Sequence, residues 1–163
     1  MDDPWDRRLG FWWIAEDHAA VPAIVASPDG PRTYGELAGD AHQLVHLFRS
    51  LGVTHGDVVA TLADNGNTLV ECSLATGEAG LQFTPLNVHL TARELETIMD
   101  HSGCKVLVAD ARFAPLLDHV RDAIPELHIL TVGELPGHRT LEAERSAFPR
   151  SEPTDRRPGS LFV

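Results

Sequence analysis

The sequence predicts an α/β fold: a mostly parallel sheet flanked by helices on both faces. Short continuous apolar runs mark the expected strands, at residues 58–63, 81–86 and 106–109. Between these runs, residues 69–76 and 95–99 carry apolar side chains at helical spacing. Apolar strands that alternate with amphipathic helices are typical of β-α-β-α-β units, in which helices cover both faces of a parallel sheet.

Capping residues predict where the helices begin. Thr33 is followed by Glu36 at the spacing of a capping box, and Thr91 is followed by Glu94 in the same way. From Leu37 onward, apolar residues recur along one face of a long helix that is expected to end at Gly52. The segment 64–67 (Asp-Asn-Gly-Asn) has turn chemistry that can also cap a helix.

Weaker patterns extend the fold on either side. Residues 5–20 predict a helix with Trp5, Leu9, Trp12 and Trp13 close together on it, and residues 23–26 predict a short strand. The segment 27–31 (Ser-Pro-Asp-Gly-Pro) is a turn by composition. A helix over residues 113–120, ended by Pro125, and a strand over 127–132 are expected to follow the central units.

We divide the chain into an α/β N-terminal subdomain (1–132), a polar segment and linker (133–159) and the start of a further strand (160–163). In the middle part, Leu135, Leu141 and Phe148 are isolated apolar residues. The last four residues, Ser-Leu-Phe-Val, resemble a strand that begins where the chain stops, whereas natural termini are usually polar. We therefore expect a truncated subdomain, the front part of a longer protein.

Composition excludes several classes of protein. The chain has 163 residues, 43% of them hydrophobic, which suits one globular domain of ordinary size. Its 24 acidic residues outnumber 13 basic ones, and a net charge of -11 argues against nucleic acid as a partner. No apolar run approaches the roughly 18 residues of a membrane helix, and the N-terminus does not resemble a signal peptide. Two cysteines without a disulfide framework suit the cytoplasm, with both thiols buried as small apolar groups.

A metal site is the first chemistry to test. His42 and His46 stand at i and i+4 on the predicted long helix, a spacing that can chelate zinc. The metalloprotease motif requires Glu after the first histidine, where this chain has Gln43. His101, His119 or His128 could supply a third ligand only through the fold. Ordinary helix histidines are favoured, and no metal-binding residue is predicted.

Phosphate-binding and nucleophile motifs are missing from the sequence. It contains neither GxGxxG nor GxxxxGK[ST], and its one lysine, Lys105, begins a predicted strand. It contains no GxSxG elbow, and neither cysteine belongs to a recognisable catalytic signature. Segment 64–67 follows a strand, at the edge where open α/β sheets bind ligands, but a structural turn is favoured there. No catalytic and no cofactor-binding residue is predicted.

The order of segments nevertheless resembles a known family. Residues 32–60, 63–95 and 101–110 together resemble the N-terminal portion of AMP-forming acyl-CoA synthetases, the fatty-acid–CoA ligases of the adenylate-forming superfamily. The resemblance is clear over about residues 10–110. Pro85-Leu86-Asn87, with Thr91 and Glu94 beyond it, is closer to acyl-CoA ligases than to the adenylation domains of peptide synthetases.

The resemblance implies a reaction for the full-length family. Such enzymes join a carboxylate to ATP, giving an acyl-adenylate and pyrophosphate, and then pass the acyl group to coenzyme A. It implies ATP, Mg²⁺ and CoA as cofactors and a fatty or related carboxylic acid as substrate, none of them bound tightly by this fragment. The family's phosphate loop follows a strand similar to residues 159–163, so no catalytic residue is carried over. We expect an inactive fragment that self-associates through exposed sheet or core surface.

Two alternatives remain open on the sequence. One is a non-catalytic α/β binding or interaction module that reuses the fold, for example by docking on a full-length synthetase. The other is a metalloenzyme built on His42 and His46, which predicts stoichiometric zinc in the purified protein.

Overall fold

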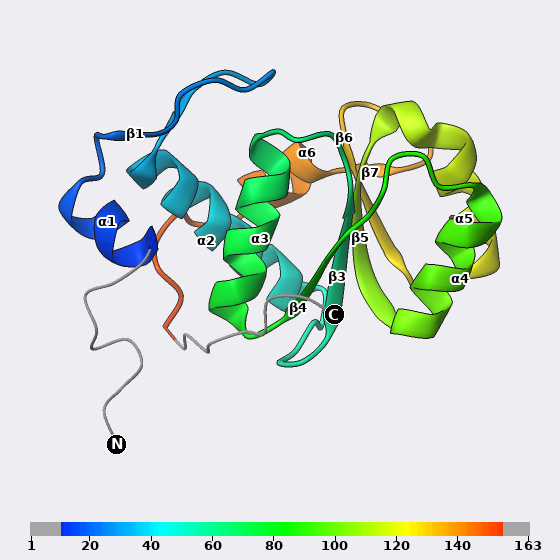
Figure 1. Ribbon diagram of the computed structural model, residues 1–163. Coiled ribbons are helices and arrows are strands. Elements are labelled where there is room, and N and C mark those ends of the chain that lie inside the picture. The colour runs from blue at the N-terminus through cyan, green and yellow to red at the C-terminus, as the bar shows by residue number, and fades with distance from the viewer. Residues whose placement is uncertain (1–10, 155–163) are drawn as a thin grey trace.

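A computed structural model of the chain describes residues 11–154; the expected positions of Trp5 and Leu9 and the strand at 160–163 lie outside the described residues. Its centre is a five-stranded sheet in the order β4-β3-β5-β6-β7, with every neighbouring pair parallel (Figure 1). The strands are β3 (Val58–Leu62), β4 (Gln82–Pro85), β5 (Cys104–Asp110), β6 (His128–Val132) and β7 (Arg139–Thr140). The predicted parallel α/β fold is confirmed.

Helices cover both faces of this sheet. The two longest, α2 (Tyr34–Ser50) and α3 (Asn67–Ala79), lie on one face with α6 (Leu141–Ser146), and α4 (Ala92–Ser102) and α5 (Ala114–Ala123) lie on the other (Figure 1). A short helix, α1 (Phe11–Asp17), packs beside α2, and a 3₁₀ turn, η1 (Ala111–Phe113), leads from β5 into α5. The helices are therefore distributed as the sequence predicts.

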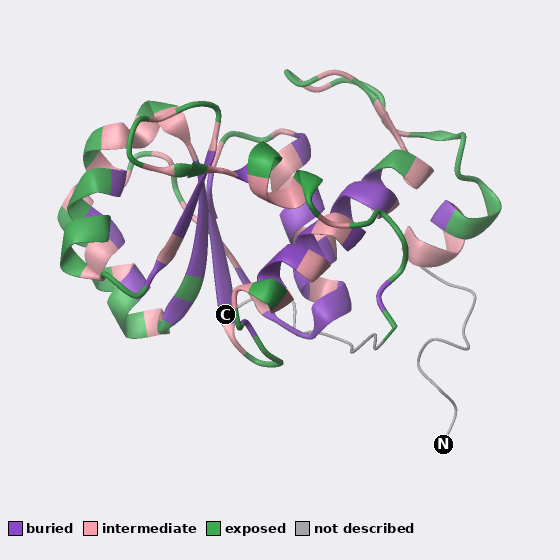
Figure 2. Ribbon diagram, turned by 180° about the vertical axis from the view of Figure 1, so that it is seen from behind, coloured by how far each residue is buried: buried purple, intermediate pink, exposed green. Residues whose placement is uncertain are grey.

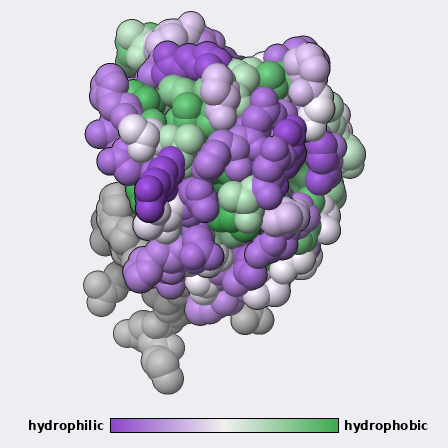
Figure 3. All heavy atoms as spheres, turned by 90° about the vertical axis from the view of Figure 1, so that its right-hand side faces the viewer, coloured by the Kyte–Doolittle hydropathy of each residue, from purple (hydrophilic) through white to green (hydrophobic). Residues whose placement is uncertain are grey.

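Alternation along the strands produces two hydrophobic cores. Val59 and Val108 pack in the core shared with α2 and α3, whereas Ala60 and Leu107 pack in the core shared with α4 and α5. All five residues of β3 are buried, as expected for a central strand of a parallel sheet. Strands β3, β5 and β6 are mostly buried, and the outer faces of the helices are exposed (Figure 2). Polar residues dominate the outer surface on the α4–α5 side (Figure 3).

Both predicted capping boxes are present. Glu36 N donates to Thr33 Oγ1 at 3.2 Å, and Thr33 N donates to the Glu36 carboxylate at 2.8 Å. At the start of α4, the same pair of bonds joins Thr91 and Glu94. Each box satisfies backbone N–H groups that the first turn of a helix leaves unpaired. Gly52, predicted to stop α2, follows the last turn with a φ of +80°, which favours glycine.

The predicted strand near residues 23–26 exists but does not join the main sheet. It is β1 (Pro22–Ile24), which pairs antiparallel with β2 (Arg32–Thr33) in a separate two-stranded hairpin. This β1–β2 hairpin extends from beside α2 above the start of α3, toward the upper end of the main sheet in the view of Figure 1. Its turn, predicted from Pro28, Asp29 and Gly30, brings Asp29 back to the start of α3, as described below.

No sequence pattern predicted β7 and α6, which lie in the segment interpreted as polar linker. Thr140 caps α6 by accepting a hydrogen bond from Ala143 N at 3.3 Å, and Leu141 is fully buried in the α2–α3 core. A two-residue strand followed by a six-residue helix has too few apolar positions to show a period. The division of the chain at residue 132 itself stays a prediction.

Candidate functional site

A pocket of about 130 Å³ opens at the carboxyl edge of the main sheet. The chain places β4 on one side of β3 and β5 on the other, so the crossover direction reverses between β3 and β5. Ligands of open α/β sheets bind at such a switch point. The pocket is lined by residues that follow or end three strands and by residues from the hairpin and α3: Pro28, Asp29, Ala63, Asp64, Gly66, Thr68, Asp110 and Val132.

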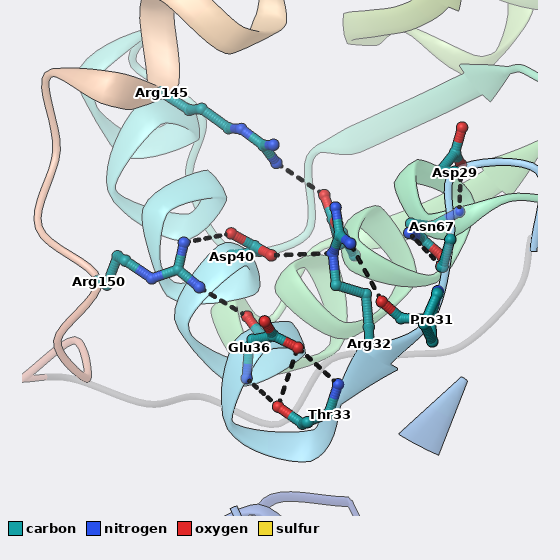
Figure 4. A network of polar contacts seen from close by, with 11 residues as sticks. Asp29, Pro31, Arg32, Thr33, Glu36, Asp40, Asn67, Arg145 and Arg150 are labelled. Atoms are coloured by element: carbon teal, nitrogen blue, oxygen red, sulfur yellow. Dashed lines mark hydrogen bonds and ion pairs between the residues drawn. The ribbon is translucent and has the colours of Figure 1, made fainter. Parts of the chain in front are cut away.

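The β1–β2 hairpin forms one wall of this pocket through Asp29. Asn67 N donates to Asp29 Oδ2 at 2.9 Å, and Asn67 Nδ2 donates to Gly30 O at 3.2 Å; Figure 4 shows both residues. Gly66 makes the approach possible, because a Cβ at that position would lie 2.5 Å from Asp29 Oδ2. The hairpin and the start of α3 are therefore joined by direct hydrogen bonds.

A single arginine joins the carboxyl ends of β3 and β5. Arg112 Nη2 lies 2.5 Å from Asp64 Oδ1, and Arg112 Nε lies 3.7 Å from Asp110 Oδ2. Asp64 N also donates to Asp110 Oδ2 at 3.3 Å. The Arg112 guanidinium lies over the Phe113 ring, 4.6 Å from its centroid, so its geometry is fixed from a second side.

The charge of the pocket decides what it can hold. Its lining includes the carboxylates of Asp29, Asp64 and Asp110, and the arginine beside it is already paired with two of them. Phosphate oxygens would meet net repulsion at this edge. Asp29 also takes the first N–H of α3, which a phosphate at this helix end would need. The lining of this pocket therefore does not fit the phosphates of ATP or CoA, and none of its residues is given a catalytic role.

The structure accounts for His42 and His46 without a metal. His42 Nδ1 lies 3.1 Å from Arg150 O, and His46 Nε2 lies 3.1 Å from Ser151 O. Of the proposed third ligands, His119 pairs instead with the Glu96 carboxylate at 2.7 Å. Within residues 11–154, no three histidine, cysteine or carboxylate side chains are grouped to hold a metal ion.

Both cysteines are buried, as the sequence predicts. Cys72 lies in the α2–α3 core and Cys104 in the α4–α5 core, and neither forms a disulfide. Burial raises the pKa of the Cys104 thiol to about 12, and burial raises the pKa of Cys72 above its ordinary value as well. Thiols with such pKa values are not nucleophiles at neutral pH.

No sequence motif indicated Asp29, Asp110 and Arg112. Asp64 and Gly66 belong to the segment that the sequence placed at the edge of the sheet, and that position is correct. The available signal was Asp110 at the end of an apolar run with Arg112 two residues later.

Across residues 11–154, no helix has the length and apolar character needed to cross a bilayer.

Comparison with known families identifies this architecture. The family model described as "AMP-binding enzyme" matches residues 11–160, which is nearly all of the chain. The chain belongs to the AMP-binding enzyme family. The resemblance to the N-terminal portion of adenylate-forming acyl-CoA synthetases, based on sequence segments alone, is confirmed by this match.

Curated relatives of this AMP-binding chain include several acyl-activating ligases. It is 32% identical over 124 residues to crotonobetaine/carnitine–CoA ligase of Salmonella typhimurium, covering 71% of this chain and 24% of the relative. It is 35% identical over 104 residues to feruloyl-CoA synthase of an Amycolatopsis species, covering 63% and 21%. The chain thus spans about a fifth to a quarter of the length of the curated relatives it matches.

Solved structures of AMP-binding enzymes share the fold. An anthranilate CoA ligase in complex with anthranoyl-AMP superimposes with a TM-score of 0.80 at 24% identity, covering 92% of this chain and 30% of that one. A benzoate CoA ligase from Burkholderia xenovorans LB400 gives 0.71 at 22% identity, covering 85% and 28%. At these identities the likeness establishes the fold of this AMP-binding chain.

Proposed function

We propose that this chain is the N-terminal portion of an ATP-dependent acyl-CoA ligase, in which a carboxylate and ATP give an acyl-adenylate that is then converted to a CoA thioester. The observation that carries the proposal is the AMP-binding match over residues 11–160. The ligase names of the relatives support it. The phosphates of ATP and CoA, with the Mg²⁺ that accompanies them, would be held by the rest of such an enzyme, because the acidic pocket between β3 and β5 does not suit phosphates.

The substrate class is a carboxylic acid, fatty or related. The names of two relatives specify crotonobetaine or carnitine and ferulic acid, an aliphatic and an aromatic type of acid. The Pro85-Leu86-Asn87 segment favours the acyl-CoA ligase branch of the superfamily. The proposal therefore extends to carboxylic acids as a class and to no particular member.

We infer further that the 163-residue chain does not catalyse the reaction alone. Its described residues supply a sheet, two cores and a pocket beside which Arg112 pairs with Asp64 and Asp110. Such a part acts as a scaffold. Self-association belongs to the same proposal: Val21 and Val25, on and beside the projecting hairpin, are exposed large apolar side chains that a second surface would cover. The cytoplasm is the proposed location.

The test is ATP–pyrophosphate exchange with a panel of aliphatic and aromatic acids, on material whose intact mass has been measured. The chain at 17.8 kDa is expected to give no exchange, and native protein from the source is expected to be heavier and active. Exchange by the 17.8 kDa chain that persists through a second, orthogonal purification step, which excludes a contaminant, overturns the inference that it is inactive. An inactive native protein overturns the ligase proposal.

The alternative from the sequence, a non-catalytic binding or interaction module, is separated by the same measurement. It predicts a native mass of 17.8 kDa with no exchange activity. No contact among residues 11–154 favours this module over the ligase.

A further inference from the structure

The segment that follows α6 is irregular, yet α2 holds it along its length. We call residues 147–151 the strap. Three of its backbone carbonyls lie against three polar side chains of α2, more than 100 residues earlier in the chain. The pairs are Gln43 Nε2 to Phe148 O at 2.8 Å, His42 Nδ1 to Arg150 O at 3.1 Å and His46 Nε2 to Ser151 O at 3.1 Å.

The side chain of Arg150, in the strap, also binds α2. Its guanidinium donates to Asp40 Oδ1 at 2.6 Å and to Glu36 O at 3.0 Å (Figure 4). Gly39 lies beneath it, and a Cβ at that position would be 2.7 Å from Arg150 Nε. The absence of a side chain at Gly39 therefore leaves the space that the guanidinium fills.

The other end of the strap is anchored by α6 and by packing. Arg145 of α6 donates to Glu71 Oε2 of α3 at 2.7 Å, and the ring of Phe148 packs against the α2–α3 core. The strap thus enters from a fixed helix and then runs across α2. Its carbonyls need these donors, because an irregular segment cannot satisfy its own backbone groups as a helix or strand does.

These contacts explain His42 and His46, whose spacing along the helix could also chelate zinc. An imidazole nitrogen that contacts a carbonyl oxygen must carry a hydrogen, since the carbonyl can only accept. His42 Nδ1 and His46 Nε2 are therefore donors and cannot also bind a metal through those atoms. Gln43, which departs from the metalloprotease pattern, supplies the third donor.

We propose that His42, Gln43 and His46 form a clamp that holds the strap on α2 and so fixes where the chain leaves this sheet. The inference rests on the proposed function for its consequence: in an acyl-CoA ligase, the clamp sets the position of the polypeptide that follows the strap. The three side chains are then positioning residues that act through the backbone of residues 148–151. The clamp itself stands on the contacts above, whichever reaction the protein performs.

The test is local opening of the strap in Gln43→Ala and His46→Ala, with His89→Ala as the matched control, an exposed histidine on the loop before α4. Amide hydrogen exchange is measured for residues 147–154 and, separately, for β3 and β5. Trypsin cleavage after Arg150 is followed by mass spectrometry. Each lost hydrogen bond is expected to raise strap exchange and cleavage about fivefold. Exchange in β3 and β5 should stay within twofold of the wild-type rate.

A conservative replacement sharpens the test. His46→Gln keeps a side-chain N–H donor and is expected to restore at least part of the protection lost in His46→Ala. Unchanged exchange and cleavage in both alanine variants would overturn the clamp. An equal rise in the strap and in β3 would also overturn it, because the side chains would then support the core alone. None of these readouts uses ligase activity, so failure of the clamp and failure of the proposed function are distinguishable.

Discussion

Asp29 Oδ2, in the β1–β2 hairpin, accepts a hydrogen bond from Asn67 N, the first residue of α3, at 2.9 Å. The N-cap residue of α3 is Gly66, which has no side chain to cap the helix. The Asp29 carboxylate, 38 residues earlier in the chain, therefore caps the helix in place of a local side chain. Its negative charge also interacts favourably with the helix dipole.

Replacing Asp29 should destabilise the protein through the start of α3. Asp29→Ala is expected to lower the free energy of unfolding by about 1 kcal/mol, the usual cost of a lost N-cap. Urea unfolding measures it. Asp29→Asn keeps an acceptor oxygen and should cost less than the alanine variant. If the alanine variant unfolds at the wild-type midpoint, the hairpin does not cap α3.

Leu141 tests whether the segment after residue 132 is part of the folded core. Its side chain is fully buried against the α2–α3 face, so Leu141→Ala should cost about 2–5 kcal/mol. Leu135→Ala, at a half-buried position, is the matched comparison and should cost clearly less. Thermal or urea unfolding gives both values. Equal small losses would place α6 outside the cooperative core.

Strands β3 to β6 of the main sheet and the two capping boxes could be predicted because their signals are local. An apolar run such as residues 106–109, or a pair such as Thr91 and Glu94, identifies its element without knowledge of the rest of the chain. The elements that the sequence missed depend on distant partners. Leu141 is an isolated apolar residue in sequence and a fully buried one in the fold, because α2 and the sheet cover it.

Removing one partner of the buried Glu71–Arg145 ion pair should destabilise the protein more than replacing both partners. The Glu71 carboxyl is 3% exposed, and burial raises its pKa despite the arginine 2.7 Å away. Arg145→Met alone leaves that carboxylate without its partner and should cost about 3 kcal/mol at neutral pH. Replacing both residues, as Glu71→Leu with Arg145→Met, should cost about 1 kcal/mol. Urea unfolding of the wild type, Glu71→Leu, Arg145→Met and the double variant forms a double-mutant cycle. If the two single losses add up to the loss in the double variant, the two residues are not coupled.

The sign of the pH effect in Arg145→Met follows from the raised pKa of Glu71. A carboxyl whose pKa is higher in the folded state binds its proton more tightly there, so acid favours folding. The Arg145→Met variant should therefore regain part of its lost stability as pH falls through the raised pKa. Unfolding midpoints from neutral pH down to mildly acidic pH measure this, with Glu71→Leu/Arg145→Met as the control that lacks the titrating group.

The pKa of Glu94 is shifted in the opposite direction from that of Glu71, so its effect on stability should have the opposite pH dependence. The backbone N–H of Thr91, and then its hydroxyl, donate to this carboxylate and lower its pKa. A lowered folded pKa contributes stability that is present above the unfolded pKa and is lost as pH falls through the folded value. Glu94→Gln should therefore flatten the acid limb of the stability curve. Glu126→Gln, at an exposed position outside any helix, should leave the limb unchanged.

The thiols of Cys72 and Cys104 should be unreactive in the native protein. Both are buried, and burial raises the pKa of each, to about 12 for Cys104. A chromogenic disulfide reagent at neutral pH should therefore label neither cysteine until denaturant is added, when two equivalents should react. Rapid labelling of either thiol without denaturant would show that its core opens.

The contacts of the candidate pocket and of the clamp join residues far apart in the chain, and most of them could not be predicted from the sequence. The position of Asp64 at the carboxyl edge of the sheet could be predicted, since parallel strands all end at that edge, although a structural turn was the favoured interpretation of segment 64–67. Its partners Asp29 and Arg112 come from other elements and have no motif. At His42 and His46 the pattern was noticed, but backbone carbonyls 105 or more residues away leave no trace in sequence spacing.

The distance along the chain between α2 and the strap also orders events during synthesis. A ribosome completes α2 long before it makes Phe148, whose carbonyl lies 105 residues beyond Gln43. The sheet strands β3 to β6 emerge in between and can pair while the donors of α2 still face water. Closure of the strap is then among the last contacts that residues 11–154 can make. It reports that every earlier element has already left the ribosome.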